Sequence, residues 1–459
     1  MTSGRIVSLP EFAPRLPPLS DYRQRVERFD PVLQNGKVAQ VIGLVIESIG
    51  PNAMLGEICD IYYDRANRYD PARPPIKAEV VGFRDNRVLL MPLGVMEGIK
   101  PGSDVVATRQ TQQVAVGDAL LGRMLDGLGR PMDGGPPLSP GRTRPLNAAP
   151  PNAVTRPRIR ETLQTGVRAL DGCLTLGKGQ RLGIFAGSGV GKSTLMGMIA
   201  RNTDADVNVI ALVGERGREV RDFVEESLGP EGVQRSIVVV ATSDQPALVR
   251  IKAAFVATAI AEHFRDEGAD VMLMMDSVTR LALAQREVGL AIGEPPATRG
   301  YTPSVFGILP RLLERAGTSG TGSGSITGLY TVLVEGDDMN EPVADAVRGI
   351  LDGHVVLSRS LAHQGHYPAV DVLQSISRVM PQIVCPEQRA SAEAMREVLA
   401  TYRDAEDLIN IGAYVDGTNP RIDHAKAKID AVNAFLQQRS EEPTGYEETL
   451  RRMLTQFPA

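Results

Sequence analysis

Residues 181–194 read Arg181-Leu-Gly-Ile-Phe-Ala-Gly-Ser-Gly-Val-Gly-Lys-Ser-Thr194. The stretch up to Ala186 is typical of a buried strand, and a glycine-rich turn and the start of a helix follow it. Backbone N–H groups of such a turn converge and hold phosphate oxygens. Lys192 is expected to reach the β and γ phosphates, and the Ser193 hydroxyl to bind Mg²⁺. The stretch therefore predicts a nucleoside triphosphate site.

The turn departs from the usual pattern at its first position, where Ala186 stands in place of a glycine. A methyl group is tolerated there only if the residue keeps a negative φ. A turn without a ligand is the alternative, and Gly-Lys-Ser in register after an apolar strand argues against it. The residues predicted to bind the nucleotide here are Gly187, Ser188, Gly189, Val190, Gly191, Lys192, Ser193 and Thr194.

Composition limits the classes of protein to consider. The length of 459 residues suggests about three domains, and the net charge of -5 with 4% aromatic residues and no Trp argues against direct nucleic-acid binding. The chain has three cysteines, which fit free thiols in a reducing compartment. His363 and His366 are expected to be structural rather than metal ligands. The sequence lacks a long apolar run and a secretory signal, so we expect a cytoplasmic protein without a transmembrane segment.

Five segments differ in composition. Residues 1–30 are rich in proline, and both a docking arm and a frayed terminus fit them. Residues 31–110 contain short strand candidates punctuated by Gly, Pro and Asn, which predict a small β-barrel. Residues 111–158 are predicted to be a Pro/Gly-rich linker at the surface. In residues 159–385 strands alternate with helices, and residues 386–459 are predicted to be helical.

The predicted fold is therefore α/β, with a P-loop (RecA-like) parallel-sheet core between a small N-terminal β-barrel and a C-terminal helical domain. The run Val207–Val213 is predicted to be a strand, and the continuous apolar run Val271–Met275 is expected to be a strand buried on both faces. In the barrel, Val38–Ile46 is predicted to be one strand.

Two acidic residues follow these strands. Asp276 ends the second apolar run, where a Mg²⁺ ligand belongs in such a sheet, although many strands also end in an Asp that caps the next helix. Glu215 follows the first run, at the edge where ligands bind and where a group must orient the attacking water. A surface charge run, or an acid in the first turn of the next helix, would give the same pattern. Position alone leaves these alternatives for Glu215 open.

Four motifs together resemble the type III export ATPases, relatives of the catalytic and non-catalytic subunits of the F-type and V-type ATP synthases. The resemblance extends from about residue 30 to the end, and Ala186 in the loop is typical of this branch. The motifs are Ala186-Gly-Ser-Gly-Val-Gly-Lys-Ser193, Gly214-Glu-Arg-Gly-Arg-Glu219, Gly300-Tyr-Thr-Pro-Ser-Val-Phe306 and Val334-Glu-Gly-Asp-Asp-Met-Asn-Glu-Pro342.

This resemblance implies roles for five residues. Glu215 matches the catalytic glutamate that activates water, and Arg216 and Arg280 match arginines near the γ-phosphate. Tyr367 matches a tyrosine that stacks on adenine, although it could instead pack a turn. Arg378 matches an arginine finger that enters a neighbouring subunit's site, although it could instead pair with a local carboxylate.

A finger acting in trans requires a head-to-tail contact, which closes into a ring when it is repeated. The resemblance thus implies a homohexamer that hydrolyses Mg-ATP to energise flagellar type III protein export, peripherally associated with the inner-membrane export apparatus. It also implies that the N-terminal arm binds an export regulator, and that the C-terminal domain faces export substrates, chaperones and the membrane export gate.

Other functions share parts of this pattern. Leu408-Ile-Asn-Ile-Gly-Ala-Tyr-Val-Asp-Gly417 and the ending Gln456-Phe-Pro resemble the flagellar branch, and the virulence injectisome ATPases are the near alternative. A catalytic subunit of a rotary ATP synthase and an RNA-translocating ring helicase are more distant alternatives. A non-catalytic ring subunit is disfavoured, because such relatives carry glutamine in place of Glu215.

Overall fold

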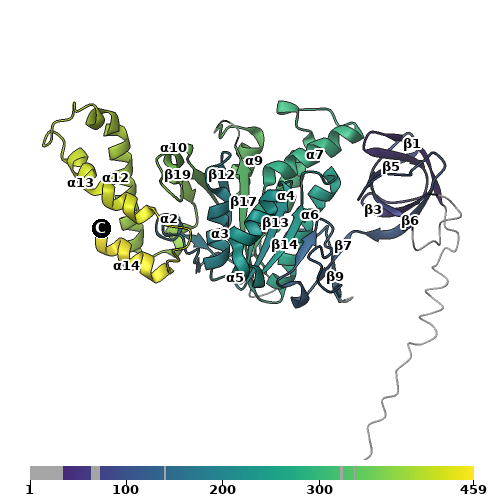
Figure 1. Ribbon diagram of the computed structural model, residues 1–459, viewed down its shortest axis with the longest axis horizontal. Helices are drawn as coiled ribbons and strands as arrows, with labels where there is room; N and C mark the ends of the chain where they lie inside the picture. The colour runs from purple at the N-terminus through teal and green to yellow at the C-terminus, as the bar shows by residue number, and fades with distance from the viewer. Residues whose placement is uncertain are drawn as a thin grey trace, which may run out of the picture.

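The computed structural model describes most of the chain and shows three parts in a row (Figure 1). A β-barrel stands at one end, a sheet covered by helices lies in the middle, and the C-terminal helices form the other end. The segment 1–30, predicted as an arm, lies outside the described residues. The described residues are 35–63, 73–138, 141–320, 324–334, 336 and 338–458.

The N-terminal part is a closed six-stranded barrel in the order β1-β2-β5-β4-β3-β6. The stretch Val38–Ile46, predicted as one strand, is divided between two strands, because Gly43 adopts a φ of 58° and turns the chain into a hairpin. The barrel strands are β1 Gly36–Ile42, β2 Val45–Ile49, β3 Glu57–Tyr62, β4 Ile76–Arg84, β5 Arg87–Pro92 and β6 Asp104–Thr111.

The central part is a nine-stranded sheet in the order β19-β18-β12-β17-β15-β13-β14-β8, with β16 paired to β17. The strands from β18 to β8 in this order run parallel, and β19 and β16 are antiparallel to their neighbours. Its strands are β8 Met124–Asp126, β12 Arg181–Ala186, β13 Val207–Val213, β14 Ser236–Ala241, β15 Asp270–Asp276, β16 Gly317–Thr318, β17 Ser325–Leu333, β18 Gly353–Leu357 and β19 Val370–Ser377.

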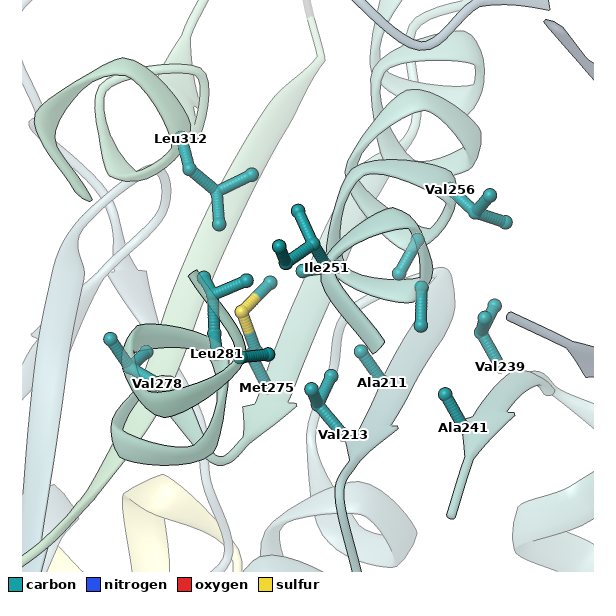
Figure 2. Close-up of a cluster of buried hydrophobic side chains, with 14 of the residues drawn as sticks. Ala211, Val213, Val239, Ala241, Ile251, Val256, Met275, Val278, Leu281 and Leu312 are labelled. Carbon is teal, nitrogen blue, oxygen red and sulfur yellow. The ribbon is translucent and has the colours of Figure 1, made fainter. Parts of the chain in front are cut away.

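Helices cover both faces of this sheet, and the strand β13 shows why apolar residues point to both sides of it. Val209, Ala211 and Val213 pack into one buried cluster with the helices α6 (Ala247–Asp266) and α7 (Val278–Ile292). Ile210 and Leu212 pack into a second cluster with α3 (Lys192–Asn202) on the opposite face. Figure 2 shows part of the first cluster. The predicted α/β fold with a barrel and a helical C-terminal part is confirmed.

The α-helices are α2 Arg168–Cys173, α3 Lys192–Asn202, α4 Gly217–Asp222, α5 Gly229–Gln234, α6 Ala247–Asp266, α7 Val278–Ile292, α8 Pro303–Leu313, α9 Pro342–Ile350, α10 Arg359–His363, α11 Met380–Ile383, α12 Pro386–Asn410, α13 Pro420–Leu436 and α14 Tyr446–Gln456. The shorter helical turns are η2 Asp118–Leu120, η3 Phe223–Leu228 and η4 Thr298–Gly300. None of the helices in the described parts of the chain has both the length and the apolar character needed to cross a membrane.

The segment 111–158, predicted as a surface linker, contributes strands to the core. β8 is the edge strand of the central sheet, and β7 Gln113–Val116 pairs with β9 Arg142–Pro145. The cause is apolar burial, because Val114, Leu125 and Leu146 are each at most 2% exposed. A further small pair joins β10 Thr162–Leu163 to β11 Leu176–Gly177.

Ion pairs fix the outer parts to the centre. Lys252 of α6 lies 2.6 Å from Glu79 of β4, and both side chains are at most 10% exposed. At the other end, Arg403 of α12 lies 3.2 Å from Asp371 of β19. Charge-assisted contacts of this kind orient one element on another.

Candidate nucleotide-binding site

The glycine-rich turn joins the carboxyl end of β12 to the amino end of α3. Gly189 and Gly191 have φ values of 78° and 91°, which other residues adopt only with strain. Ala186 is the last residue of β12 and is paired on both sides within the sheet, so its backbone is extended and its methyl group is tolerated. The free N–H groups at the start of α3 point out of the helix and suit an anion.

A cavity of about 640 Å³ opens at this turn. Val190 does not line it, because its side chain is 2% exposed and packs into the core beside α3, which leaves only its backbone to face a ligand. The lining residues from the turn and helix are Ala186, Gly187, Ser188, Gly189, Gly191, Lys192, Ser193 and Thr194.

Lys192 lies between two buried carboxylates. Its Nζ donates to Oδ1 of Asp276 at 2.5 Å and lies 3.6 Å from Oε1 of Glu215. The hydroxyl of Thr331 also donates to Oδ1 of Asp276, at 2.7 Å. Asp276 does not cap the following helix, because Ser277 is the N-cap of α7 and accepts from the backbone N–H of Arg280. The alternative interpretation of Asp276 as a cap is therefore wrong.

Glu215 is buried beside this lysine, with only 7% of its surface exposed. Its Oε1 lies 3.3 Å from Nε of Arg280, whose Nη1 donates to the carbonyl of Gly214 at 2.8 Å. Burial raises the pKa of Glu215, and its hydrogen bond with Glu219 acts in the same direction. Glu215 precedes α4 and is buried, so it is neither part of a surface charge run nor an acid of the first helical turn.

Arg216 and Arg280 both line the cavity, but they differ in exposure. The Arg216 side chain is 77% exposed and pairs with Glu219, whereas the Arg280 side chain is 30% exposed and faces Glu215. Arg280 is therefore fixed at the buried end, and Arg216 stands at the open rim.

A second cavity, of about 860 Å³, adjoins the first and shares with it Gly189, Gly191 and Thr194. Tyr367 forms part of its wall, and a β-carbon at Gly191 would lie 3.6 Å from the tyrosine Cε1. The ring is 47% exposed and borders the cavity, so it does not merely fill a turn. A ring placed beside a phosphate turn in this way is suited to stack on a base.

The opposite wall of this second cavity comes from the C-terminal part, at residues 434 and 437–442. Gln438 donates its backbone N–H to the carbonyl of Tyr367 at 2.9 Å. Its side-chain oxygen accepts from the N–H of Arg168, and Arg168 donates from its guanidinium to the carbonyl of Phe435 at 2.9 Å. The second cavity is thus built jointly by the core and the C-terminal part.

The structure does not bring Arg378 to this site. Its backbone N–H donates to the carbonyl of Asp352, whose own N–H donates to the carbonyl of Arg181, the first residue of β12. The phosphate turn leaves the other end of that strand, at Ala186, about 16 Å away at about 3.3 Å per residue. The described contacts thus place the backbone of Arg378 near the end of β12 opposite to the phosphate turn.

Sequence reasoning missed Glu219, Thr331, Arg359 and the wall at 437–442. Thr331 meets Asp276 only because β17 lies beside β15 in the sheet, and Arg359 lines the first cavity from the start of α10. The wall at 437–442 lies far along the chain from the turn it faces. A glutamate one helical turn from Glu215 was the one signal in the motif that could have indicated Glu219.

Three family models match the chain in succession. The ATP synthase alpha/beta family beta-barrel domain matches residues 38–109, the nucleotide-binding domain of that family matches residues 166–377, and the T3SS EscN ATPase C-terminal domain matches residues 384–455. The three matches follow the barrel, the sheet and the C-terminal helices.

Individual relatives agree. The chain is 57% identical to the flagellum-specific ATP synthase of Bacillus subtilis, over 93% of this chain and 95% of that protein. It superposes on the assembled ATPase EscN of the enteropathogenic E. coli type III secretion system with a TM-score of 0.86 and 45% identity, covering 92% of this chain and all of that one. EscN in complex with its central stalk EscO gives a TM-score of 0.83 and 44% identity over the same shares of the two chains. The chain therefore belongs to the ATP synthase alpha/beta family, among the flagellum-specific ATP synthases and type III secretion system ATPases.

Proposed function

We propose that this chain is the subunit of a homohexameric ring ATPase that hydrolyses Mg-ATP to energise flagellar type III protein export across the inner membrane. The observation that carries the proposal is the cluster of Lys192 with the carboxylates of Glu215 and Asp276, at the cavity that the glycine-rich turn lines. The likeness to the Bacillus subtilis protein supports the flagellar role. The likeness to EscN supports an injectisome role as the second candidate.

The arrangement suits hydrolysis of a phosphoanhydride. With a triphosphate in the turn, Lys192 would exchange its contact with Asp276 for phosphate oxygens and offset their charge. Glu215, just before the start of α4, would accept a hydrogen bond from a water molecule and direct that water at the γ-phosphate. Arg280 holds Glu215 from the side and limits where its carboxylate can point.

The residues present fit a magnesium ion. Mg²⁺ prefers oxygen ligands, and the Ser193 hydroxyl and the Asp276 carboxylate are both oxygen donors at the carboxyl edge of the sheet. Ser193 lines the cavity, and Asp276 contacts Lys192, the neighbour of Ser193 in the chain, at 2.5 Å. When bound, the ion would neutralise charge on the β and γ phosphates.

A ring completes the site. In each subunit Arg378 lies at the wrong end of β12 for its own nucleotide, so a head-to-tail neighbour must receive it. The assembled state of EscN supports this arrangement. Each interface would then combine the phosphate turn and Glu215 of one subunit with the arginine of the next.

The partner assignments are part of the same proposal. The ring would work in the cytoplasm against the inner-membrane export apparatus, with residues 1–30 binding a regulator. The C-terminal domain would face export substrates, chaperones and the export gate. An apolar tip between α12 and α13 supports a contact role for this domain, because Leu408, Ile411 and Val415 are 49%, 75% and 64% exposed.

Tyr367→Ala is expected to weaken ATP binding about tenfold to a hundredfold, because base–aromatic stacking contributes about 1–3 kcal/mol. Calorimetric titration with Mg-ATP and with Mg-tripolyphosphate would separate the base from the phosphates. Tripolyphosphate binding should stay unchanged, and Tyr414→Ala, at the distant tip of the C-terminal helices, should change neither. Equal affinity of Tyr367→Ala and the unmodified chain for ATP would show that the ring does not hold the base.

The proposed function is tested by the mass of the assembly and the rate of ATP hydrolysis. Light scattering with and without Mg-ATP should show growth to a six-fold species, and ATP hydrolysis should require Mg²⁺ and rise with protein concentration. In the source bacterium, deletion of the gene should abolish flagellar assembly, and loss of effector secretion instead would select the injectisome role. A monomer that hydrolyses ATP at full speed at every concentration would contradict the ring.

A further inference from the structure

Arg378 is held by a short turn between α9 and β18. Its backbone N–H donates to the carbonyl of Asp352 at 3.0 Å, and its Nη1 donates to the carbonyl of Leu351 at 3.2 Å. Both carbonyls belong to the two residues that connect Ile350 to Gly353. The place of the guanidinium therefore depends on the place of this turn.

The turn at residues 351–352 is itself bonded to the amino end of β12. The Asp352 carboxylate accepts from Nε and Nη2 of Arg181, at 3.0 and 3.1 Å, and from the Arg181 backbone N–H at 3.1 Å. Asp352 returns a backbone bond to Arg181 at 2.8 Å. A two-pronged guanidinium–carboxylate pair of this kind fixes direction as well as distance. Glu314 also pairs with Arg181, so the guanidinium is held from two sides.

β12 connects this anchor to the phosphate turn. The strand is hydrogen-bonded on both sides, to β17 and to β18, and it runs from Arg181 to Ala186 without a break. One stiff strand thus carries at one end the site for the subunit's own nucleotide and at the other the anchor of Arg378.

We propose that Asp352 is a positioning residue that, through Arg181, places Arg378 in the nucleotide site of the neighbouring subunit. The inference rests on the proposed function, specifically on Arg378 acting in trans. Asp352 touches neither nucleotide nor water. It acts by keeping the turn at 351–352 in one position on β12.

The turn has other supports that keep the fold intact without this carboxylate. Gln180 donates from Nε2 to the Asp352 carbonyl at 3.4 Å and to Ser377 Oγ at 3.0 Å. Gly353 lies so close to β19 that a β-carbon there would be 2.4 Å from the carbonyl of Ile376. Removal of the Asp352 side chain should therefore leave the strands paired while freeing the turn to shift. A shift of about 1 Å in a catalytic group can cost about a hundredfold in rate.

Asp352→Ala should lower kcat at least about tenfold, with the KM for ATP within about twofold of the original value. Asp352→Asn keeps the side-chain volume and one hydrogen-bond acceptor, and it serves as a second variant in case Asp352→Ala does not fold. Its kcat should lie between those of Asp352→Ala and the unmodified chain. Asp345→Ala is the matched control, because Asp345 pairs with Arg348 on the exposed side of α9 and should leave kcat unchanged. Melting temperature and ring mass are measured for each variant. A fall of less than twofold in both Asp352 variants would overturn the proposal.

Mixing subunits tests whether the effect acts across the interface. Lys192→Ala subunits lack a working phosphate site but keep Asp352 and Arg378 intact. When they are added in excess to Asp352→Ala subunits, the working phosphate sites of the Asp352→Ala subunits face the well-placed Arg378 of Lys192→Ala neighbours. The activity per Asp352→Ala subunit should then rise severalfold. No rise would mean that Asp352 serves its own subunit, and the proposal would fall.

A parallel mixture of Lys192→Ala with Arg378→Ala separates this inference from the function on which it rests. If Arg378→Ala is rescued and Asp352→Ala is not, only the role of Asp352 is wrong. If neither is rescued, the trans arginine itself is wrong, and both proposals fall. Rescue of both supports both.

Discussion

Replacing Arg378 with alanine is expected to lower ATP turnover about 10³-fold or more while nucleotide affinity changes little. An arginine that enters a phosphoryl-transfer site stabilises charge that develops in the transition state, and its loss commonly costs that much. The structure explains why binding should survive. The backbone of Arg378 bonds to Asp352, which bonds to Arg181 at the amino end of β12, whereas the phosphate turn leaves the other end of that strand, about 16 Å along it.

The measurement compares steady-state hydrolysis with calorimetric binding of a non-hydrolysable ATP analogue. Arg389→Ala is the control, because Arg389 is 57% exposed and pairs with Glu393 on its own helix. This control should keep its turnover. An Arg378→Ala ring that hydrolyses ATP at the normal rate would remove this arginine from the mechanism and with it the requirement for a shared site.

Replacing Glu215 with glutamine is expected to lower turnover by about 10²- to 10⁴-fold, which is the usual contribution of a positioned proton acceptor. Glutamine has the same shape but carries no charge, so it cannot accept a proton from the attacking water. Nucleotide binding should be retained or strengthened. Lys192 and Arg280 lie 3.6 and 3.3 Å from the Glu215 carboxylate, and in the variant no negative charge at that position would compete with the phosphates for them.

Glu225→Gln provides a matched control of the same chemical change. Glu225 lies further along the same helical segment and pairs with Arg221 at 2.7 Å, with 58% of its side chain exposed. This variant should keep full activity. Single-turnover hydrolysis and the binding of a non-hydrolysable ATP analogue, measured on the same variant, would show whether Glu215→Gln slows ATP cleavage or weakens nucleotide binding. Undiminished hydrolysis in Glu215→Gln would assign water activation to another residue.

The two arginines that line the cavity beside Glu215, Arg216 and Arg280, differ in burial. Arg280 is enclosed beside Glu215, so its position is settled before any nucleotide arrives. Arg216 is exposed at the rim and pairs with Glu219, so its position can change when a neighbouring subunit or a nucleotide contacts it. Such preorganised buried groups usually contribute more to transition-state stabilisation than mobile ones.

Parts of the fold could be predicted because short-range patterns encode them. The apolar run of β13 and the Gly-Lys-Ser turn each specify their conformation within a few residues, and both occur where predicted. The division of β1 from β2 at Gly43 was missed, because the apolar run continues through the turn residue. β8 was missed because a three-residue strand in a Pro/Gly-rich segment has no periodicity to detect.

Short-range patterns in the chain specify its local elements: a phosphate-binding turn, apolar strands, and acidic groups at the strand ends. These are set by residues that touch their near neighbours in the chain. Which distant groups meet depends on the folded arrangement of the elements. It placed Thr331 against Asp276, Gln438 against Tyr367, and Arg378 at the far end of β12. Those contacts depend on strand order and on how the C-terminal helices dock, and the free energy of such packing is spread over many side chains, so no single motif records it.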